Sequence, residues 1–563
     1  MRSRREFLQH GALAGLAGLA LPAAPALDQS PSRPAAAGST FLDLTRPPDV
    51  VAAQVSAASE RLLYPAGSSS SRWEDAGIVV TLAAGEGTRI LKLEAPATGV
   101  RRLRLRWRGR LGGVRLVMGD AWERGYGDFE WRGFVPDRVL PWYFATFDGR
   151  LTHAYGVRTG ANAFCFWQAD PDGLTLYADV RSGGANIQLG PRVLDACEIV
   201  SRPGTPGESS FTALHAFCRD LCAAPRLPPH PVYGSNDWYW AYGRNSAETA
   251  LADAARVVEL SPPDANRPFA VIDDGWQPER GRARTGVGTW DRGNEKFPDM
   301  PDLAAGIRRA GARPGLWIRP LLAASDTPDG WRLPRDHTIL DPSVPEVLQK
   351  VADDVRRVRG WGFDLVKHDY STFDIFGRWG STMADVLTRD GWGFAMGSTR
   401  TTAEIVAGLY RTIREAAGDA LVIGCNTVSH LSAGVFDICR IGDDTSGRDW
   451  TRTRKMGVNS LAFRGVQHGA FYVADADCVG VTTAIPWTLN RRWLDLLARS
   501  GTMLFVSLAP DAIGDDERRD LRAALALAAG ARPLAQPLDW QQMAWPSRWH
   551  AMDRDVTYDW IDG

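Results

Sequence analysis

Two hydrophobic patterns divide the chain near residue 230. From about 41 to 200, apolar and polar residues alternate in short runs such as 101–107 and 113–117, broken by Gly and Asp. A period of two is that of a half-buried strand, so this half predicts antiparallel strands packed as a β-sandwich. A helical pattern follows at 207–224, before a Pro-rich joint at 225–231.

Beyond residue 231 the pattern becomes strand, loop and helix in repeated order. Apolar runs predict eight strands that end at Trp238-Tyr239-Trp240, Val271-Ile272-Asp273, Leu316-Trp317-Ile318, Leu365-Val366-Lys367, Val422-Ile423-Gly424, Cys439-Arg440-Ile441, Phe471-Tyr472-Val473 and Leu504-Phe505-Val506. Helical patterns such as 344–359 and 403–416 lie between most of them. Eight strands alternating with helices predict an α/β chain with a (β/α)8 barrel after the N-terminal sandwich.

The first residues predict an address outside the cytoplasm. Ser3-Arg4-Arg5-Glu6-Phe7-Leu8 is a twin-arginine pattern, a weakly apolar stretch follows at 11–21, and Ala24-Pro25-Ala26 suits cleavage. Together these features predict a Tat signal peptide and a periplasmic or secreted protein. The alternative is a simple Ala-rich terminus. No other stretch is long and apolar enough to predict a membrane span.

These patterns predict five parts, which are a signal peptide at 1–26, a linker at 27–40, the β-sandwich domain at 41–228, the catalytic barrel at 229–525 and a short C-terminal segment at 526–563.

Composition narrows the classes of function. Of the 563 residues, 65 are basic and 66 acidic, a balance that argues against nucleic acid as the main partner. The seven cysteines are scattered and odd in number, which does not predict a disulfide framework. The sequence contains no CxxC pair and no His cluster, so no metal site is predicted, and no cofactor is expected. The 22 Trp residues suit the binding of sugar faces, although most Trp in any protein is core.

Carboxylates gather where four of the eight predicted strands end. They lie in Asp273-Asp274, in Lys367-His368-Asp369, in Asp443-Asp444 and in Asp475-Ala476-Asp477. A single Asp at such a position is more often a helix cap or turn residue. Four such strands in a barrel, whose active site lies at the carboxyl ends of its strands, indicate the paired carboxylates of glycoside cleavage.

In order and spacing, the segment from 231 to about 510 resembles the α-galactosidases of glycoside hydrolase families 27 and 36. The resemblance is carried by Ile272-Asp273-Asp274-Gly275-Trp276, Lys296-Phe297-Pro298, Gly315-Leu316-Trp317, Lys367-His368-Asp369, Arg440-Ile441-Gly442-Asp443-Asp444-Thr445 and Asp475-Ala476-Asp477-Cys478. A sandwich before the barrel fits family 36 better than family 27.

The resemblance implies a role for each matching residue. Asp369 is the expected nucleophile, and Lys367, on the same side of the strand, is expected to bind sugar hydroxyls and favour the ionised Asp369. Asp444 is the expected general acid/base. Its neighbour Asp443 is a rival, since adjacent strand residues point in opposite directions. Arg440 is expected to bind the sugar or, alternatively, to pair with a structural carboxylate.

Further residues are expected to recognise the sugar. Asp273 and Asp274 are expected to hold the O4 and O6 hydroxyls. Asn426 either binds O2 or caps a turn. The apolar wall of the site is assigned to three tryptophans, each of which plain core packing explains equally well: Trp238, Trp276 and Trp317. Asp477 either orients another group of the site or is structural.

Some positions depart from the family pattern. The loop at 425–430 lacks Gly-rich turns, Arg319 stands where many relatives have Glu, and the seventh strand lacks the family's Asn and Pro. The leading hypothesis is an exported, retaining α-galactosidase acting on an oligosaccharide or glycoside. A second is a sibling α-N-acetylgalactosaminidase or β-L-arabinopyranosidase, or a galactosyl-transferring relative. A third is an inactive carbohydrate-binding protein. The oligomeric state stays open, a homo-oligomer included.

Overall fold

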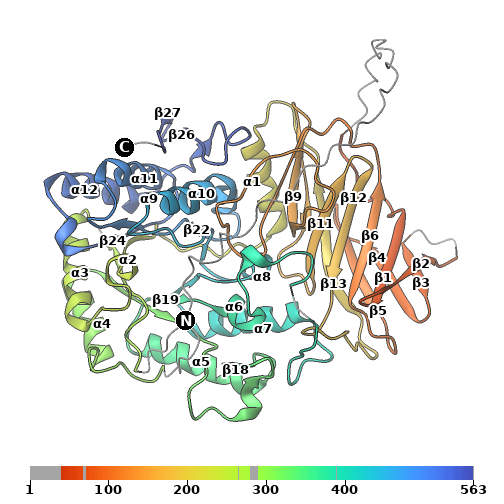
Figure 1. Cartoon of the computed structure of the whole chain (residues 1–563), viewed down its shortest axis with the longest axis horizontal. Coiled ribbons are helices and arrows are strands. Elements are labelled where there is room, and N and C mark those ends of the chain that lie inside the picture. The colour runs from red at the N-terminus through yellow and green to blue at the C-terminus, as the bar shows by residue number, and fades with distance from the viewer. Residues whose placement is uncertain (1–39, 68–70, 264–265, 279–289, 388–389, 562–563) are drawn as a thin grey trace, which may run out of the picture. The chain divides into compact units, whose positions relative to one another are not determined.

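The computed structural model describes residues 40–67, 71–263, 266–278, 290–387 and 390–561 (Figure 1). The predicted signal peptide and all of the predicted linker except Thr40 lie outside these residues. The chain from Ser39 to Gly563 forms one compact unit. The predicted domain boundary at 228/229 therefore stays a prediction.

The N-terminal half builds a large antiparallel sheet. Its strands are β1 (Val50–Ser56), β2 (Ser59–Pro65), β3 (Arg72–Asp75), β4 (Ile78–Ala84), β5 (Arg89–Glu94), β6 (Arg102–Arg108), β7 (Leu116–Gly119), β8 (Leu140–Pro141), β9 (Tyr143–Phe147), β10 (Thr152–Val157), β11 (Phe164–Asp170), β12 (Gly173–Asp179) and β13 (Leu194–Arg202). Their order is β7-β9-β10-β13-β5-β4-β3-β2-β1-β6-β12-β11-β8. In β6 the apolar residues Leu103, Leu105 and Trp107 are buried and alternate with arginines, as the period of two predicts.

A second sheet is parallel and fully buried along most of its strands. It consists of β14 (Tyr233–Asn236), β15 (Phe269–Ile272), β16 (Arg313–Ile318), β19 (Leu365–His368), β20 (Leu421–Gly424), β21 (Ile438–Arg440), β22 (Val473–Asp475), β23 (Val479–Val481) and β24 (Leu504–Leu508). The order is β22-β21-β20-β19-β16-β15-β14-β24-β23. The prediction of antiparallel strands followed by alternating parallel strands and helices is thus confirmed.

Amphipathic helices connect the parallel strands and cover them (Figure 1). The longer ones are α3 (Ala247–Leu260), α4 (Met300–Ala310), α5 (Pro345–Gly360), α7 (Thr402–Ala417), α11 (Trp487–Arg499) and α12 (Asp515–Ala529). In α5, Val347, Val351, Val355 and Val358 are buried, which is the face expected from a helical period. The helices predicted at 344–359 and 403–416 are therefore confirmed to within one or two residues.

Further helices and strands lie between and after these elements. They are α1 (Ser210–Leu221), α2 (Trp238–Ala241), α6 (Ser371–Phe376), α8 (Ser429–Ser432), α9 (Trp450–Thr453), α10 (Asn459–Arg464), β17 (Arg332–Leu333), β18 (Asp336–Leu340), β25 (Gln536–Pro537), β26 (Arg548–Ala551) and β27 (Arg554–Thr557). The last three form a small antiparallel sheet of their own in the predicted C-terminal segment.

Three predicted strand positions differ from the structure. The run Trp238-Tyr239-Trp240 begins a helix, because the Asn236 side chain accepts a hydrogen bond from the Trp238 amide (3.0 Å) and turns the chain after β14. β22 begins at Val473 rather than before it, and β7 spans Leu116–Gly119 rather than 113–117. Aromatic β-propensity alone favoured the first assignment.

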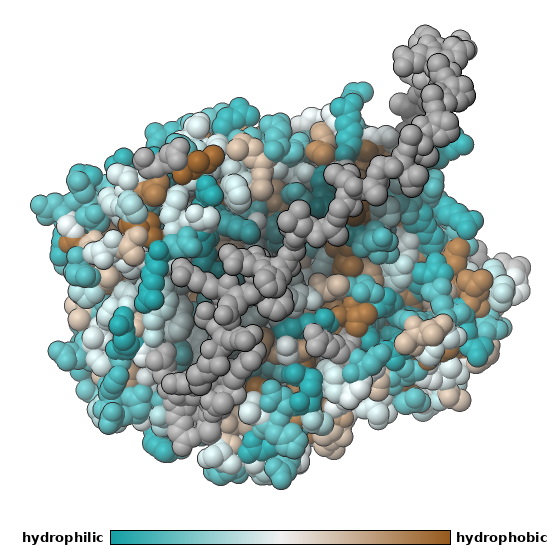
Figure 2. Space-filling view, in the orientation of Figure 1, coloured by the Kyte–Doolittle hydropathy of each residue, from teal (hydrophilic) through white to brown (hydrophobic). Residues whose placement is uncertain are grey.

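The described residues contain no helix long and apolar enough to cross a membrane. All seven cysteines lie within the described residues, where all are free and buried. Hydrophilic residues prevail on the face in Figure 2, and apolar residues form separate small areas among them.

Candidate active site

The residues predicted to carry the chemistry lie at the carboxyl ends of three strands of the parallel sheet, β15, β19 and β21. Asp273 and Asp274 follow β15, Lys367 lies in β19 with Asp369 directly after it, and Arg440 ends β21 shortly before Asp444. Parallel strands place their carboxyl ends along the same edge. The hydrogen bonds and ion pairs below link these residues into one continuous cluster.

A buried ion pair joins β15 to β19. Lys367 Nζ lies 2.6 Å from Asp273 Oδ2, and the two side chains are 11% and 5% exposed. Asn236 Nδ2 donates to the same oxygen at 2.8 Å. Burial lowers the pKa of Lys367, but the Asp273 charge outweighs it and leaves the pKa well above its usual value. Lys367 is therefore positively charged within this cluster.

Asp369 is held as a carboxylate. Trp317 Nε1 donates to Asp369 Oδ2 at 3.1 Å, and the Tyr370 amide donates to Oδ1 at 2.7 Å. Burial raises the pKa of Asp369, but Lys367, Arg124 and these two donors together bring it below the usual value. Tyr370 takes a left-handed backbone conformation (φ 67°), which turns the chain into α6 directly after the carboxylate. The ionised form suits a nucleophile.

The two adjacent carboxyls after β21 lie in different surroundings. Asp443 is 15% exposed and pairs with Arg124 (2.9 Å) and Arg452 (2.7 Å). Asp444 is 41% exposed and lies 3.2 Å from Arg440 and 3.7 Å from Arg124. Arginine pairs thus hold Asp443, whereas Asp444 opens to solvent-accessible space.

The Asp444 carboxyl favours its protonated form more than an ordinary Asp does. Surrounding protein atoms raise its pKa although part of the side chain is exposed, and the charges of Asp477 and Asp443 add to the rise. Arg440 and Arg124 oppose it without cancelling it. A raised pKa suits a group that must donate a proton.

Arg440 connects Asp444 to the end of β22. Its guanidinium is 2% exposed, lies 2.5 Å from Asp477 and donates toward the Cys425 sulfur at 3.3 Å. Asp477 also accepts hydrogen bonds from the Tyr239 hydroxyl and from the Thr445 amide. Asp477 therefore holds the Arg440 guanidinium in place, and whether this contact serves the site or only the fold stays a prediction.

Three other predicted residues have contacts outside the ion pairs of this cluster. The Asn426 side chain accepts from the Phe373 amide at 3.2 Å and so caps α6. Trp276 is fully buried and donates to the Trp317 carbonyl at 2.8 Å, as a core residue would. Trp238 packs on Tyr242, with the ring centroids 5.4 Å apart.

Two more residues of the motifs have contacts of their own. Asp274 accepts from Gln277 Nε2 at 2.7 Å. Arg319 forms a buried pair with Asp374 (2.6 Å), and its guanidinium lies over the Tyr370 ring at 4.3 Å. The departure at 319 therefore supports the turn behind Asp369.

Two further residues contact this cluster and were not predicted from the sequence. Arg124 comes from the loop after β7 in the antiparallel sheet and reaches both Asp443 and Asp444. Asp237 lies behind Asp273, whose amide donates to Asp237 Oδ1 at 2.8 Å, and burial with the Asp273 charge raises the Asp237 pKa to about 8. No local pattern marks Arg124, and Asp237 lies inside the run predicted as a strand through Trp240, whereas the structure ends β14 at Asn236 and places Asp237 directly after it.

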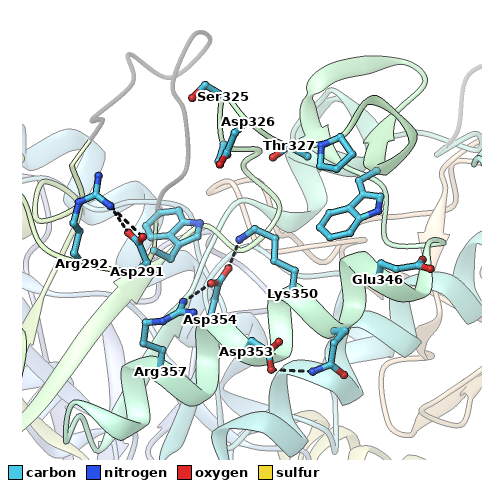
Figure 3. A pocket seen from close by; sticks show the side chains of 15 residues that line it. Asp291, Arg292, Ser325, Asp326, Thr327, Glu346, Lys350, Asp353, Asp354 and Arg357 are labelled. Carbon is cyan, nitrogen blue, oxygen red and sulfur yellow. Dashed lines mark hydrogen bonds and ion pairs between the residues drawn. The ribbon is translucent and has the colours of Figure 1, made fainter.

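A cavity of about 750 Å³ lies outside the cluster, between α5 and the loops after β15 and β16 (Figure 3). Lys350 and Arg357 both pair with Asp354 in it, at 2.5 and 2.7 Å. Trp290, another lining residue, has its ring centroid 5.9 Å from that of Trp317. One aromatic ring thus separates this cavity from the tryptophan that contacts Asp369.

The fold of the chain is similar to that of α-galactosidases of glycoside hydrolase family 36. TtGalA, the α-galactosidase from Thermus thermophilus in complex with p-nitrophenyl α-D-galactopyranoside, matches with a TM-score of 0.57 and 20% identity, over 85% of this chain and 97% of that chain. AgaA from Geobacillus stearothermophilus, a GH36 α-galactosidase, matches with a TM-score of 0.57 and 17% identity, over 80% and 67%.

The galactosidase domain of AgaSK, an α-galactosidase-sucrose kinase, matches with a TM-score of 0.51 and 17% identity, over 81% of this chain and 69% of that one. No protein-family model matches the chain. The resemblance to family 36 inferred from the motifs is confirmed at the level of the fold.

Proposed function

We propose that this protein is an exported, retaining glycoside hydrolase that cleaves terminal α-D-galactosyl residues from oligosaccharides. The observation that carries the proposal is a pair of carboxyls whose pKa values move in opposite directions. That of Asp369 lies below the ordinary value and that of Asp444 above it. Such a pair supplies a nucleophile and a general acid within one site.

The proposal includes closure of the parallel sheet into a (β/α)8 barrel. β22 and β23 form the two edges of the sheet and are separated in the chain by Ala476, Asp477 and Cys478 alone. Two strand segments so close in sequence can together occupy the seventh strand position of a barrel, with a break between them. The remaining seven strands then complete eight positions.

The mechanism is a double displacement. In the first step Asp369 attacks C1 of the galactosyl residue while Asp444 gives its proton to the departing glycosidic oxygen. In the second step Asp444 takes a proton from water, the water oxygen bonds to C1, and the bond to Asp369 breaks. The anomeric configuration is retained, and the two carboxyls return to their starting protonation states.

The charged groups around the two carboxyls suit recognition of sugar hydroxyls. Lys367, Asp273 and Arg440 are fixed by buried ion pairs, so they offer donors and acceptors that need little reorganisation on binding. Trp317 contributes an indole edge beside Asp369. Galactose is the proposed sugar because the fold neighbours are α-galactosidases and the TtGalA complex holds an α-galactoside.

The test is turnover of aryl glycosides by the mature protein from about residue 27. We expect initial rates on aryl α-galactoside that fall by more than about 1000-fold in Asp369→Asn, because the amide cannot form the ester. Asp353→Asn is the matched control, since this half-exposed Asp on α5 lies outside the cluster and its loss is expected to leave the rate unchanged.

Other outcomes separate the alternatives. Turnover of aryl α-N-acetylgalactosaminide or aryl β-L-arabinopyranoside in place of the α-galactoside keeps the mechanism and changes the substrate. Accumulation of galactosylated acceptors indicates transfer rather than hydrolysis. A folded protein that binds galactosides without turnover contradicts the proposed enzyme. For export, replacement of Arg4 and Arg5 by Lys is expected to retain the precursor inside the cell.

A further inference from the structure

A loop of the antiparallel sheet is fixed to the carboxyl end of β21. The loop spans residues 120–125 and follows β7. The Gly125 amide donates to the Ile441 carbonyl at 2.8 Å, and the Asp443 amide donates to the Gly125 carbonyl at 2.7 Å. These two bonds make a parallel bridge directly before the adjacent carboxyls. The loop is therefore held in register with the residues that the proposed mechanism uses.

A buried ion pair anchors the same loop from the other side. Arg464 at the end of α10 lies 2.8 Å from Asp120, and both side chains are 1% exposed. The Arg464 guanidinium also donates to the Glu123 carbonyl at 2.9 Å and to the Ile441 carbonyl at 3.1 Å. One arginine thus binds the loop and the end of β21 together. This leaves little freedom for the residue that lies between Glu123 and Gly125 in the loop.

That residue is Arg124, whose guanidinium is 7% exposed, lies 3.6 Å from the buried carboxylate of its neighbour Glu123 and faces four groups of the site. It lies 2.9 Å from Asp443, 3.7 Å from Asp444 and 4.0 Å from the Cys425 sulfur. Its carbon lies 5.4 Å from the centre of the Trp379 ring, which covers the planar face. The shorter contact is with the carboxyl that the mechanism does not use.

We infer that Arg124 is a positioning residue for the proposed hydrolysis, which holds Asp443 out of the site and selects Asp444 as the carboxyl that exchanges a proton with the leaving group. The inference rests on the proposed function. Adjacent acidic residues compete for one role, and a fixed cation nearer to one of them decides the competition. The antiparallel sheet thereby contributes a residue to chemistry carried out at the ends of the parallel strands.

The groups that face Asp444 come from several elements, and they are Arg440 of β21, Arg124 of the loop after β7, Asp443, Asp477 after β22, Tyr239 of α2 and Tyr370 after β19. Arg124 is the cation among them that also lowers the pKa of Asp369. Removal of Arg124 takes away a positive charge that lies near both Asp369 and Asp444, so the pKa values of both carboxyls rise.

The test is the pH profile of kcat/KM for Arg124→Met on aryl α-galactoside. Turnover requires Asp369 ionised and Asp444 protonated, so the acid limb reports the first and the alkaline limb the second. We expect both limbs to move upward, by about one pH unit for the alkaline limb. The rate on a galactoside with a poor leaving group should fall at least about tenfold more than the rate on a 2,4-dinitrophenyl galactoside, which needs no proton.

Arg452→Met is the matched control, because Arg452 also pairs with Asp443, at 2.7 Å, but comes from α9 and has no ion pair with Asp444. We expect its limbs to stay within about 0.3 pH units of the unaltered protein. Arg124→Lys, which keeps the charge, should bring the limbs back toward their original positions. Should Arg124→Met fail to fold, Arg124→Gln gives the same comparison.

The outcomes are separable. Unshifted limbs in a folded, neutral Arg124 variant, or an equal shift in Arg452→Met, overturn the inference while leaving the proposed function intact. Absence of turnover by the unaltered protein overturns both. A fall in rate with no change in the limbs or in leaving-group dependence assigns Arg124 a merely structural role.

Discussion

Removal of the Lys367 charge should weaken both the fold and the nucleophile. In Lys367→Met, Asp273 keeps its carboxylate in a site where the two partners are only 11% and 5% exposed and 2.6 Å apart. Breaking a buried ion pair by removing one partner costs about 3–5 kcal/mol, because the remaining charge is left uncompensated. For one cooperative unit of this size, that corresponds to a melting temperature lower by about 3–5 °C.

The control is the double variant Lys367→Met/Asp273→Asn, which removes both charges. It should be more stable than the single variant, since no buried charge remains without a partner. Thermal and urea unfolding of the single variant, the double variant and the unaltered protein measure the difference. Two results would refute the reasoning. One is a single variant that melts within about 1 °C of the unaltered protein, and the other is a single variant as stable as the double variant.

The same substitution should move the pH profile. Lys367 lowers the pKa of Asp369, so its loss raises that pKa and shifts the acid limb of kcat/KM upward. The residual activity of Lys367→Met on aryl α-galactoside, measured between pH 4 and 8, supplies this readout. An acid limb that does not move would mean that Lys367 serves Asp273 alone.

Three further predictions concern neighbouring groups. Burial raises the pKa of Asp237 to about 8, so the folded protein binds a proton that the unfolded chain has lost above about pH 4, and stability falls between those values as pH rises. Asp237→Asn should lack this decline, as urea unfolding at pH 5 and pH 7.5 will show. Trp317→Phe removes the 3.1 Å donor to Asp369 but keeps the ring, so the acid limb should rise and kcat should fall by about tenfold. Arg464→Met leaves Asp120 buried and unpaired, and should cost about 3–5 kcal/mol in unfolding free energy.

The parallel half of the fold could be predicted because its signals are local. Short apolar runs followed by acidic residues mark strands buried on both faces, and β15, β19 and β21 end within a residue or two of the predicted positions. The clustering of Asp273, Lys367 and Asp369 follows from parallel pairing, which aligns the ends of neighbouring strands. Local pattern and topology together were sufficient there.

Other assignments needed tertiary information. The Asn426 side-chain oxygen caps α6 by accepting from the Phe373 amide, which lies 53 residues earlier in the chain. Trp238 continues an aromatic run that suits a strand, yet the preceding Asn236 starts a helix. Arg124 lies in a loop that follows β7 of the antiparallel sheet, and only the docking of this loop brings it to Asp444. Side-chain capping and contacts between distant segments have no periodic trace in the sequence.

The anchor of the 120–125 loop also sets an order for folding during synthesis. Asp120 and its partner Arg464 are 344 residues apart in the chain. At about 5–20 residues per second, roughly 20 to 70 s separate the appearance of the two at the ribosome. Throughout that interval the antiparallel sheet can form while the loop carrying Arg124 has nothing to dock against, and contacts of such long range slow folding. The proposed active site therefore cannot be completed until α10 has been made, late in translation, and has docked on a loop made in the first quarter of translation.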